Sequence, residues 1–465
     1  MECKDSIVLT FSVLNPLKSR DVRLLPMPAD SVDAYDNSTI QLYKAANGWT
    51  NFITIIGGEK KISQPLNNKT YEYLTGPKTA TLIDATNFED LDVTIDGIVS
   101  IENVDYTVKT VAESAFKANS NKSKFAKLTI KEGVQRIEPN AFANFSSLAT
   151  LSLPSSLRYI GDNAFKGNGS LENLEIPEVV DTISIGMYAF SGCSKINKIQ
   201  LPSTLTKIGD YAFNNCNNVY DIINKVRNPF PISDNVFSSY TAAMYVPIGS
   251  KEAYQKASGW KNFKTIYEGE RKEYTDEKIG MSFVCATGDK TAILTKITTT
   301  AKDVKVPDSI MVTGDSKDYK VIAIDKSVCN NNASMESLKI SENVKTIGAN
   351  AFSNCSKLSM VWLPSTLQEI GKNAFSNCRA ITYICSSVKV PFEIDLSVFS
   401  DYSKPTLYVP DGTAKDYKGK GGWEQFQNVV EGYLVDVPTI DDMTYLRIRN
   451  GEGTSASGTA SADLD

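Results

Sequence analysis

One phrase that recurs along the chain constrains its fold more than any other feature. The phenylalanine of its Ala-Phe pair returns at intervals of 23 to 26 residues from Phe116 to Phe213, and again from Phe352 to Phe375. The clearest copies are SSLRYIGDNAFKGN at 155–168, STLTKIGDYAFNNC at 203–216, ENVKTIGANAFSNC at 342–355 and STLQEIGKNAFSNC at 365–378. A fixed period of this length predicts a stack of similar structural units in place of one layered core.

Each repeat predicts two opposite walls of a coil. The pattern L-x-x-L-x-L-P, as in LSMVWLP at 358–364, ends in alternating residues that predict a short strand, and proline then terminates the strand. Leu157 and Ile160 return to the core, Ile-Gly marks a bend, and Ala-Phe lies inside the far wall. The predicted fold is an α/β-type leucine-rich-repeat solenoid of mostly short parallel strands, turns and short helices, in which one repeat forms one rung.

A longer duplication predicts two tandem modules, with small β-rich N-terminal caps and helical C-terminal caps. Residues 71–95 are echoed at 283–306, and the closing segment 243–269 is echoed at 406–432. The predicted domains are a C-terminal cap remnant of a preceding module, a first module of about five rungs, a second module of about three rungs, and a C-terminal extension with a flexible tail. Their boundaries are 1–58, 59–269, 270–432 and 433–465.

The closing segment predicts the helix of the C-terminal cap. The stretch SKEAYQKASGWKNF reads as an amphipathic helix of about three turns. Tyr254, Trp260 and Phe263 are its apolar anchors. A solenoid end exposes its core, so a unit of this kind is expected to cover it.

Composition argues against several classes of function. The chain has no histidine, which removes Ser-His-Asp catalysis and histidine-ligated zinc. Sugar hydrolysis would need a pair of carboxylates across a cleft, and acidic residues such as Asp162 and Glu175 do not recur as such a pair. The net charge is −5 without a basic stripe, and no apolar run approaches the roughly 18 residues that span a bilayer. We expect no enzyme, cofactor, metal site, nucleic-acid partner or membrane span, and we see no signal peptide.

Four of the eight cysteines occupy one position of the repeat. Cys193, Cys216, Cys355 and Cys378 each lie three residues after a repeat phenylalanine, and no C-x-x-C pair occurs. They could form a redox or metal ladder, or they could be small buried side chains that fill a turn. The second interpretation is favoured, because free cysteine is among the most buried residue types.

These motifs resemble those of the BspA-like leucine-rich-repeat surface proteins. The resemblance is carried by the phrase L-x-x-I-x-I-P-x-x-L-x-x-I-G-x-x-A-F-x-x-C and the closure Y-V-P…A-Y…G-W-x-x-F, and it covers roughly 71–269 and 283–432. It implies a non-catalytic, extracellular or surface-displayed protein that adheres to host extracellular-matrix or cell-surface proteins, to other microbes, or to glycans. A structural spacer that displays another domain is the alternative.

Three residues of the second module are candidate binding residues. The central outward residues of the strands are Thr129, Ser152, Glu175 and Gln200 in the first module, and Lys339, Trp362 and Cys385 in the second. The column beside the latter runs through Ser337, Met360 and Tyr383. Met360, Trp362 and Tyr383 are therefore expected to form an exposed aromatic–sulfur patch that contacts a partner. The other interpretation is that a cap or the first module covers it.

Overall fold

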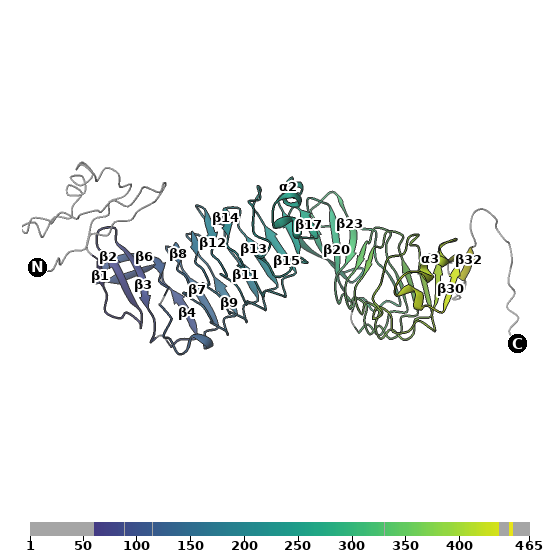
Figure 1. Ribbon diagram of the computed structural model, residues 1–465, viewed down its shortest axis with the longest axis horizontal. Helices are drawn as coiled ribbons and strands as arrows, with labels where there is room; N and C mark the ends of the chain where they lie inside the picture. Colours follow the sequence, from purple (N-terminus) through teal and green to yellow (C-terminus); the bar gives the residue numbers. More distant parts are fainter. Residues whose placement is uncertain (1–59, 88, 114, 330, 437–445, 450–465) are drawn as a thin grey trace, which may run out of the picture. The chain divides into compact units, whose positions relative to one another are not determined.

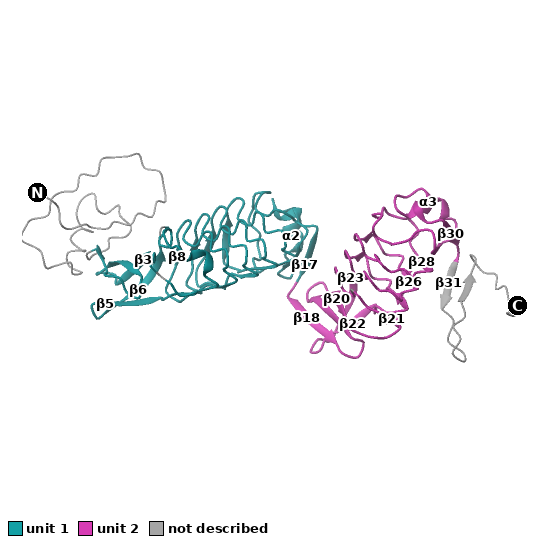
Figure 2. Ribbon diagram, turned by 90° about the horizontal axis from the view of Figure 1, so that it is seen from below, with its two compact units in different colours: residues 1–268 teal, residues 269–465 magenta. Residues whose placement is uncertain are grey.

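The computed structural model describes residues 60–436 and 446–449, apart from 88, 114 and 330. The chain divides into two compact units, Met1–Glu268 and Gly269–Asp465, which Figure 2 colours separately. Residues 1–58, the predicted cap remnant, lie outside the described part. The domain boundaries of the sequence analysis stay predictions.

Unit 1 is a coil with two walls of β-sheet (Figure 1). In the first wall β1, β2 and β3 pair antiparallel, β5 pairs antiparallel with β6, and the remaining pairs are parallel. Its strands are β1 (Lys60–Ile62), β2 (Thr70–Leu74), β3 (Thr79–Asp84), β5 (Ile98–Ile101), β6 (Val104–Val111), β8 (Arg136–Ile137), β10 (Tyr159–Ile160), β12 (Ile183–Ile185) and β14 (Leu205–Ile208).

The second wall of unit 1 is parallel throughout and consists of two sheets. They contain β4 (Asp92–Ile95), β7 (Lys127–Ile130) and β9 (Thr150–Ser152), followed by β11 (Asn173–Glu175), β13 (Lys198–Leu201), β15 (Asp221–Asn224), β16 (Ala243–Val246) and β17 (Thr265–Glu268). Neighbouring strands therefore belong to successive rungs, which is the connectivity of a solenoid.

Unit 2 has the same two walls. The first contains β18 (Arg271–Asp276), β19 (Met281–Ala286), β20 (Thr291–Ile297), β22 (Ser309–Met311), β23 (Asp318–Ile324), β25 (Thr346–Ile347) and β27 (Glu369–Ile370). The second contains β21 (Asp303–Lys305), β24 (Ser337–Lys339), β26 (Met360–Leu363), β28 (Tyr383–Ser386), β29 (Thr406–Val409) and β30 (Asn428–Glu431). A two-stranded sheet of β31 (Tyr433–Asp436) and β32 (Leu446–Arg449) follows.

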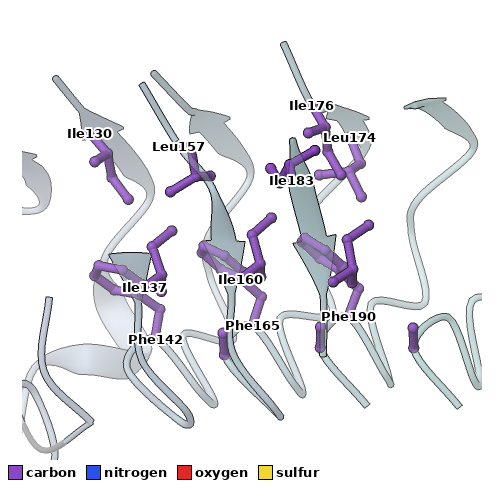
Figure 3. Close-up of a cluster of buried hydrophobic side chains, with 14 of the residues drawn as sticks. Ile130, Ile137, Phe142, Leu157, Ile160, Phe165, Leu174, Ile176, Ile183 and Phe190 are labelled. Atoms are coloured by element: carbon purple, nitrogen blue, oxygen red, sulfur yellow. The ribbon is translucent and has the colours of Figure 1, made fainter. Parts of the chain in front are cut away.

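A continuous column of phenylalanine rings lies between the walls. Phe142, Phe165, Phe190 and Phe213 are fully buried, and their successive ring centroids are 5.4, 5.2 and 5.6 Å apart with interplanar angles of 14°, 4° and 5°. Figure 3 shows three of these rings in succession beneath the inward aliphatic side chains. The period of the sequence thus becomes a stacking distance, and the predicted solenoid is confirmed. Aromatic rings at these separations attract each other beyond the effect of burial alone.

The Ile-Gly pair is explained by the distance between rungs. A Cβ atom at Gly161 would lie 2.5 Å from the backbone nitrogen of Pro139, and one at Gly209 would lie 2.4 Å from that of Met187. Gly371 faces the backbone nitrogen of Ala349 at 2.4 Å in the same way. Glycine is needed here because the preceding rung leaves no room for a side chain.

Helices are few, and this revises the α/β-type description of the fold. Among the described residues the α-helices are α2 (Lys251–Lys256) and α3 (Ala414–Lys418), and the 3₁₀-helices are η1 (Lys122–Lys124), η2 (Trp260–Asn262) and η3 (Trp423–Gln425). Among the residues that the structure describes, the rungs themselves are built from strands and turns without α-helix.

The helix predicted in the closing segment is shorter than expected. It covers six residues in place of about three turns, and η2 follows after a break. The helix ends where Ala257 becomes extended, with a φ of −70° and a ψ of 135°, and Gly259 then has a φ of 75°. A Cβ at Gly259 would lie 2.4 Å from the carbonyl oxygen of Ile232, so glycine is needed in this turn. The anchors Tyr254 and Trp260 are nevertheless buried, and they donate hydrogen bonds to the carbonyl oxygens of Val226 and Phe230.

Candidate binding surface

The second wall of unit 2 presents two outward rows of side chains beside an inward aliphatic row. Because side chains alternate along a strand, the buried inward residues fix which residues face outward. The inward row contains Leu338, Val361, Ile384 and Leu407, all with 0% exposure. The outward rows, in register from β21 to β30, are Asp303, Ser337, Met360, Tyr383, Thr406 and Asn428, and beside them Lys305, Lys339, Trp362, Cys385, Tyr408 and Val430.

Large apolar and aromatic side chains are concentrated in the middle of these rows, on β26, β28 and β29. We call the aromatic part, formed by Met360, Trp362, Tyr383 and Tyr408, the aromatic face. Trp362 and Tyr383 are half-buried and pack against Cys385 and Tyr408, which are each 8% exposed. The rings of Tyr383 and Tyr408 have centroids 6.3 Å apart. Burial raises the pKa of Tyr408, so this phenol stays neutral in ordinary conditions.

The three residues proposed from the sequence thus lie next to one another, although none is fully exposed. Met360 pairs in register with Tyr383, and Trp362 pairs with Cys385. Trp362 and Tyr383 are half-buried because they pack against Cys385 and Tyr408 on adjacent strands, which a single-strand pattern does not reveal. The structure does not test whether they bind a partner.

Tyr408 and Val430 were missed by the sequence analysis. Tyr408 belongs to the Y-V-P closing segment, which was read as a cap, whereas the register places it directly beside Cys385. Val430 follows in the same row and is 38% exposed. The signal that could have found them is the alternation of TLYV at 406–409, which continues the strand pattern of the rungs.

The corresponding row of unit 1 differs at one position in particular. It runs through Glu175, Gln200, Ile223, Tyr245 and Tyr267. In this alignment Gln200 stands where unit 2 has Trp362, and its amide donates to Glu175 at 2.8 Å. The half-buried tryptophan is therefore a feature of unit 2 and is not imposed by the repeat.

The acidic residues of the rungs are engaged in holding adjacent rungs together. Glu132 accepts hydrogen bonds from the backbone N–H and hydroxyl of Ser155 at 2.7 and 3.1 Å, and Glu342 does the same for Ser365 at 3.0 and 2.8 Å. The backbone N–H of Ser155 is the main cause of the lowered pKa of Glu132. Asp162 accepts the backbone N–H of Met187 at 2.7 Å. These contacts give the carboxylates a structural role.

The repeated cysteines have a structural role as well. Each is buried, and each thiol donates to a carbonyl oxygen of the preceding rung at 3.1 to 3.3 Å. Burial raises the pKa of Cys216 to about 12 and raises that of Cys193 further, which keeps both as unreactive thiols at neutral pH. Within the described ranges, no cluster of three or more histidine, cysteine, aspartate or glutamate residues could hold a metal ion.

Two surface hollows are present in unit 1. One of about 590 Å³ is lined by Arg158, Val180, Asp181, Thr182 and Thr204, and another of about 570 Å³ is lined in part by Asp96, Lys131 and Glu132. The charged residues of both are already paired. Arg158 forms an ion pair with Asp181, and Lys131 forms one with Asp96 at 2.8 Å.

The repeat itself matches a known family. The family described as BspA type leucine rich repeat region matches residues 66–184, 109–243 and 322–410, in six copies. The chain belongs to this family. The BspA-type match covers the rungs of both units, whose geometry accounts for the Ile-Gly and Ala-Phe motifs.

Several solved structures are similar to this BspA-type protein at low identity. A leucine rich cell surface protein from Faecalibacterium prausnitzii is 17% identical over 80% of this chain and 94% of that chain, with a TM-score of 0.30. The T. pallidum leucine rich repeat protein is 21% identical over 40% of this chain and 81% of its own, with a TM-score of 0.34. The pneumococcal vaccine antigen PcpA is 16% identical over 80% and 98%, with a TM-score of 0.31.

No curated protein matches the chain. In the part of the sequence that the structure describes, the helices are too short and too polar to cross a membrane.

Proposed function

We propose that this BspA-type protein is a non-catalytic recognition protein, surface-displayed or secreted, that binds host matrix or cell-surface proteins or other microbes through the aromatic face of unit 2. The observation that carries the proposal is the half-buried Trp362, which packs against the cluster of Cys385 and Tyr408 on the outside of the sheet. Membership of the BspA-type family supports display at the surface.

The chemistry of the aromatic face suits a protein partner. Tryptophan and tyrosine supply large, rigid contact areas, and they are the residues most enriched among those that dominate binding energy. Lys305 and Lys339 continue the row of Trp362 on its polar side, so the face has an apolar centre and a cationic margin. An apolar centre with a polar rim is the usual anatomy of a protein interface.

A structural spacer is the second candidate, and the outward rows argue against it. A spacer would be expected to have uniformly polar outer rows, as unit 1 has at Thr129, Ser152, Glu175 and Gln200. Met360 and Trp362 interrupt that pattern at the rung where unit 1 has Lys198 and Gln200, whereas the tyrosines near the closing end, Tyr245 and Tyr408, are common to both units. A glycan stacked on Trp362 is a different partner class, and the experiment below separates it.

The test is binding of the full chain to immobilised fibronectin, laminin and collagen, and in parallel to a glycan array. Trp362→Gln is the decisive variant, because unit 1 has glutamine at this position. Val390→Gln is the control: Val390 is 83% exposed in the same unit and lies outside the aromatic face. Loss of a central aromatic anchor is worth about 2 kcal/mol, or about 30-fold in affinity.

We expect Trp362→Gln to bind at least one matrix protein about 30-fold more weakly while its thermal unfolding midpoint stays unchanged, and Val390→Gln to bind like the wild type. Wild-type binding that is unaffected by Trp362→Gln would refute the role of the face. Binding of the glycan array alone would replace the protein partner by a sugar.

A further inference from the structure

A second surface feature, in unit 1, involves two tyrosines in a strained backbone conformation. The residue before the Ala-Phe pair has a positive φ in rung after rung: Asn140 (59°), Asn163 (56°), Tyr188 (54°), Tyr211 (57°), Asn350 (56°) and Asn373 (58°). Asparagine tolerates this left-handed region because its short polar side chain can hydrogen-bond locally. A bulky residue there is a genuine outlier. Tyr188 and Tyr211 therefore occupy positions where asparagine would be less strained.

The two tyrosines form an outer stack that follows β12 and β14. Their rings are 4.8 Å apart with an interplanar angle of 6°. The ammonium group of Lys166, from the preceding rung, lies 5.2 Å from the centroid of Tyr188. The core does not need these rings, because Phe190 and Phe213 already fill it.

One end of this stack is available to a partner. Tyr211 is 36% exposed and Met187, beside Tyr188, is 43% exposed. Among the described residues, no ring other than Tyr188 and no cation lies against Tyr211. The stack of rings thus ends at Tyr211, because the next rung has Asn235 at the equivalent position, and the ring of Tyr211 stays partly exposed.

Acidic side chains accompany the stack. Asp210 precedes Tyr211, and Asp234 occupies the equivalent position of the next rung. Each uses one oxygen to bind a neighbour: Asp210 accepts from the hydroxyl of Ser233 at 2.6 Å, and Asp234 accepts from the amide of Asn262 at 2.7 Å. Neither is in an ion pair with any residue that the structure describes. Two carboxylates without an ion-pair partner among the described residues therefore flank Tyr211 in its own rung and in the next.

We propose that Tyr188 and Tyr211, with Asp210 and Asp234 alongside, form a docking site for an arginine or lysine side chain of a partner protein. Lys166 provides the template, because it already places a cation over the ring of Tyr188. A partner's guanidinium group would do the same at Tyr211, where cation–π attraction and two carboxylates act together. This site is separate from the aromatic face and does not depend on it.

The experiment measures binding of the full chain to a fluorescent ten-residue peptide of alternating arginine and glycine. The same peptide with citrulline in place of arginine removes the charge while keeping the shape. Tyr211→Asn and the double variant Tyr188→Asn/Tyr211→Asn install the residue that other rungs carry, so folding is preserved. Tyr220→Asn is the matched control, since Tyr220 is 43% exposed outside the stack.

We expect the double variant to bind the arginine peptide at least fivefold more weakly, and to unfold at the same temperature as the wild type or higher. The citrulline peptide should bind weakly to all forms, and Tyr220→Asn and Trp362→Gln should behave like the wild type. Because the tyrosine variants keep every charge, non-specific attraction to the acidic chain cannot produce this difference. Equal binding by wild type and double variant, equal binding of both peptides, or Tyr211-dependent binding to a neutral sugar in place of the peptide would overturn the proposal.

Discussion

Removal of one ring from the phenylalanine column tests the physical basis of the fold. Phe190 is fully buried between Phe165 and Phe213, at centroid distances of 5.2 and 5.6 Å. A buried Phe→Ala change costs about 3–5 kcal/mol, including the cavity that it leaves. Phe190 also loses two stacked pairs, each worth about 0.5–1.5 kcal/mol, which places Phe190→Ala at the upper end, near 5 kcal/mol.

The assay combines chemical denaturation with hydrogen exchange read by mass spectrometry. Each rung contacts only its neighbours, so the exchange should accelerate most in the rungs of Phe165 and Phe213 and little in unit 2. Phe190→Leu keeps most of the apolar volume but loses both stacked pairs, so it should cost about 1–3 kcal/mol, less than Phe190→Ala. Val180→Ala, at a residue that is 87% exposed, should change the free energy of unfolding by less than about 0.5 kcal/mol.

Two results would refute this reasoning. A loss below about 1.5 kcal/mol for Phe190→Ala would mean that the column does not carry the stability of the rungs. Faster exchange spread equally over both units would mean that the rungs are not coupled mainly to their neighbours.

Two further predictions concern the glycine bend and alkaline pH. Gly209→Ala should lower the free energy of unfolding by about 1–3 kcal/mol, because its Cβ would lie 2.4 Å from the backbone nitrogen of Met187. Gly169→Ala is the control and should have little effect, since its Cβ would meet its nearest atom at 3.6 Å. Equal losses of the two variants in denaturant titrations would contradict the steric explanation. Burial raises the pKa of Tyr417 to about 12, so the folded state holds this proton more tightly than the unfolded state. The contribution of this group to the free energy of unfolding is therefore complete below about pH 10 and is lost as the pH rises towards 12. Tyr417→Phe removes the hydrogen bonds of this hydroxyl to the Val388 carbonyl oxygen and to the Ser386 hydroxyl, so it should lose about 1–3 kcal/mol at neutral pH. It should also show a shallower decline of stability between pH 10 and 12, and an unchanged slope would contradict this assignment.

The rungs were predictable because their determinants repeat in the sequence. The Ala-Phe and Ile-Gly motifs each place one residue type at one position of every turn, so the period alone predicts a stack. The residues Phe165 and Phe190 were expected to lie over one another, and they do. The burial of the repeated cysteines was likewise predictable, because the repeat puts them beside the phenylalanine column.

The length of the closing helix was not predictable from the same kind of reasoning. An amphipathic pattern suits a helix through Trp260, but the chain leaves the helix at Ala257, and Gly259 then passes close to the carbonyl group of Ile232 with a positive φ. Ile232 belongs to a segment almost 30 residues earlier, and a local pattern does not contain this close approach.

The sequence by itself determined the period, the inward aliphatic and phenylalanine positions, and hence a solenoid of the BspA type. It also placed Met360, Trp362 and Tyr383 on adjacent outward positions. Only the tertiary structure decided how far these side chains are buried, that Tyr408 joins them, and that Tyr188 stacks on Tyr211. The reason is physical: a residue's place within its own rung follows from local alternation, whereas its exposure and ring contacts depend on what the adjacent rungs place beside it.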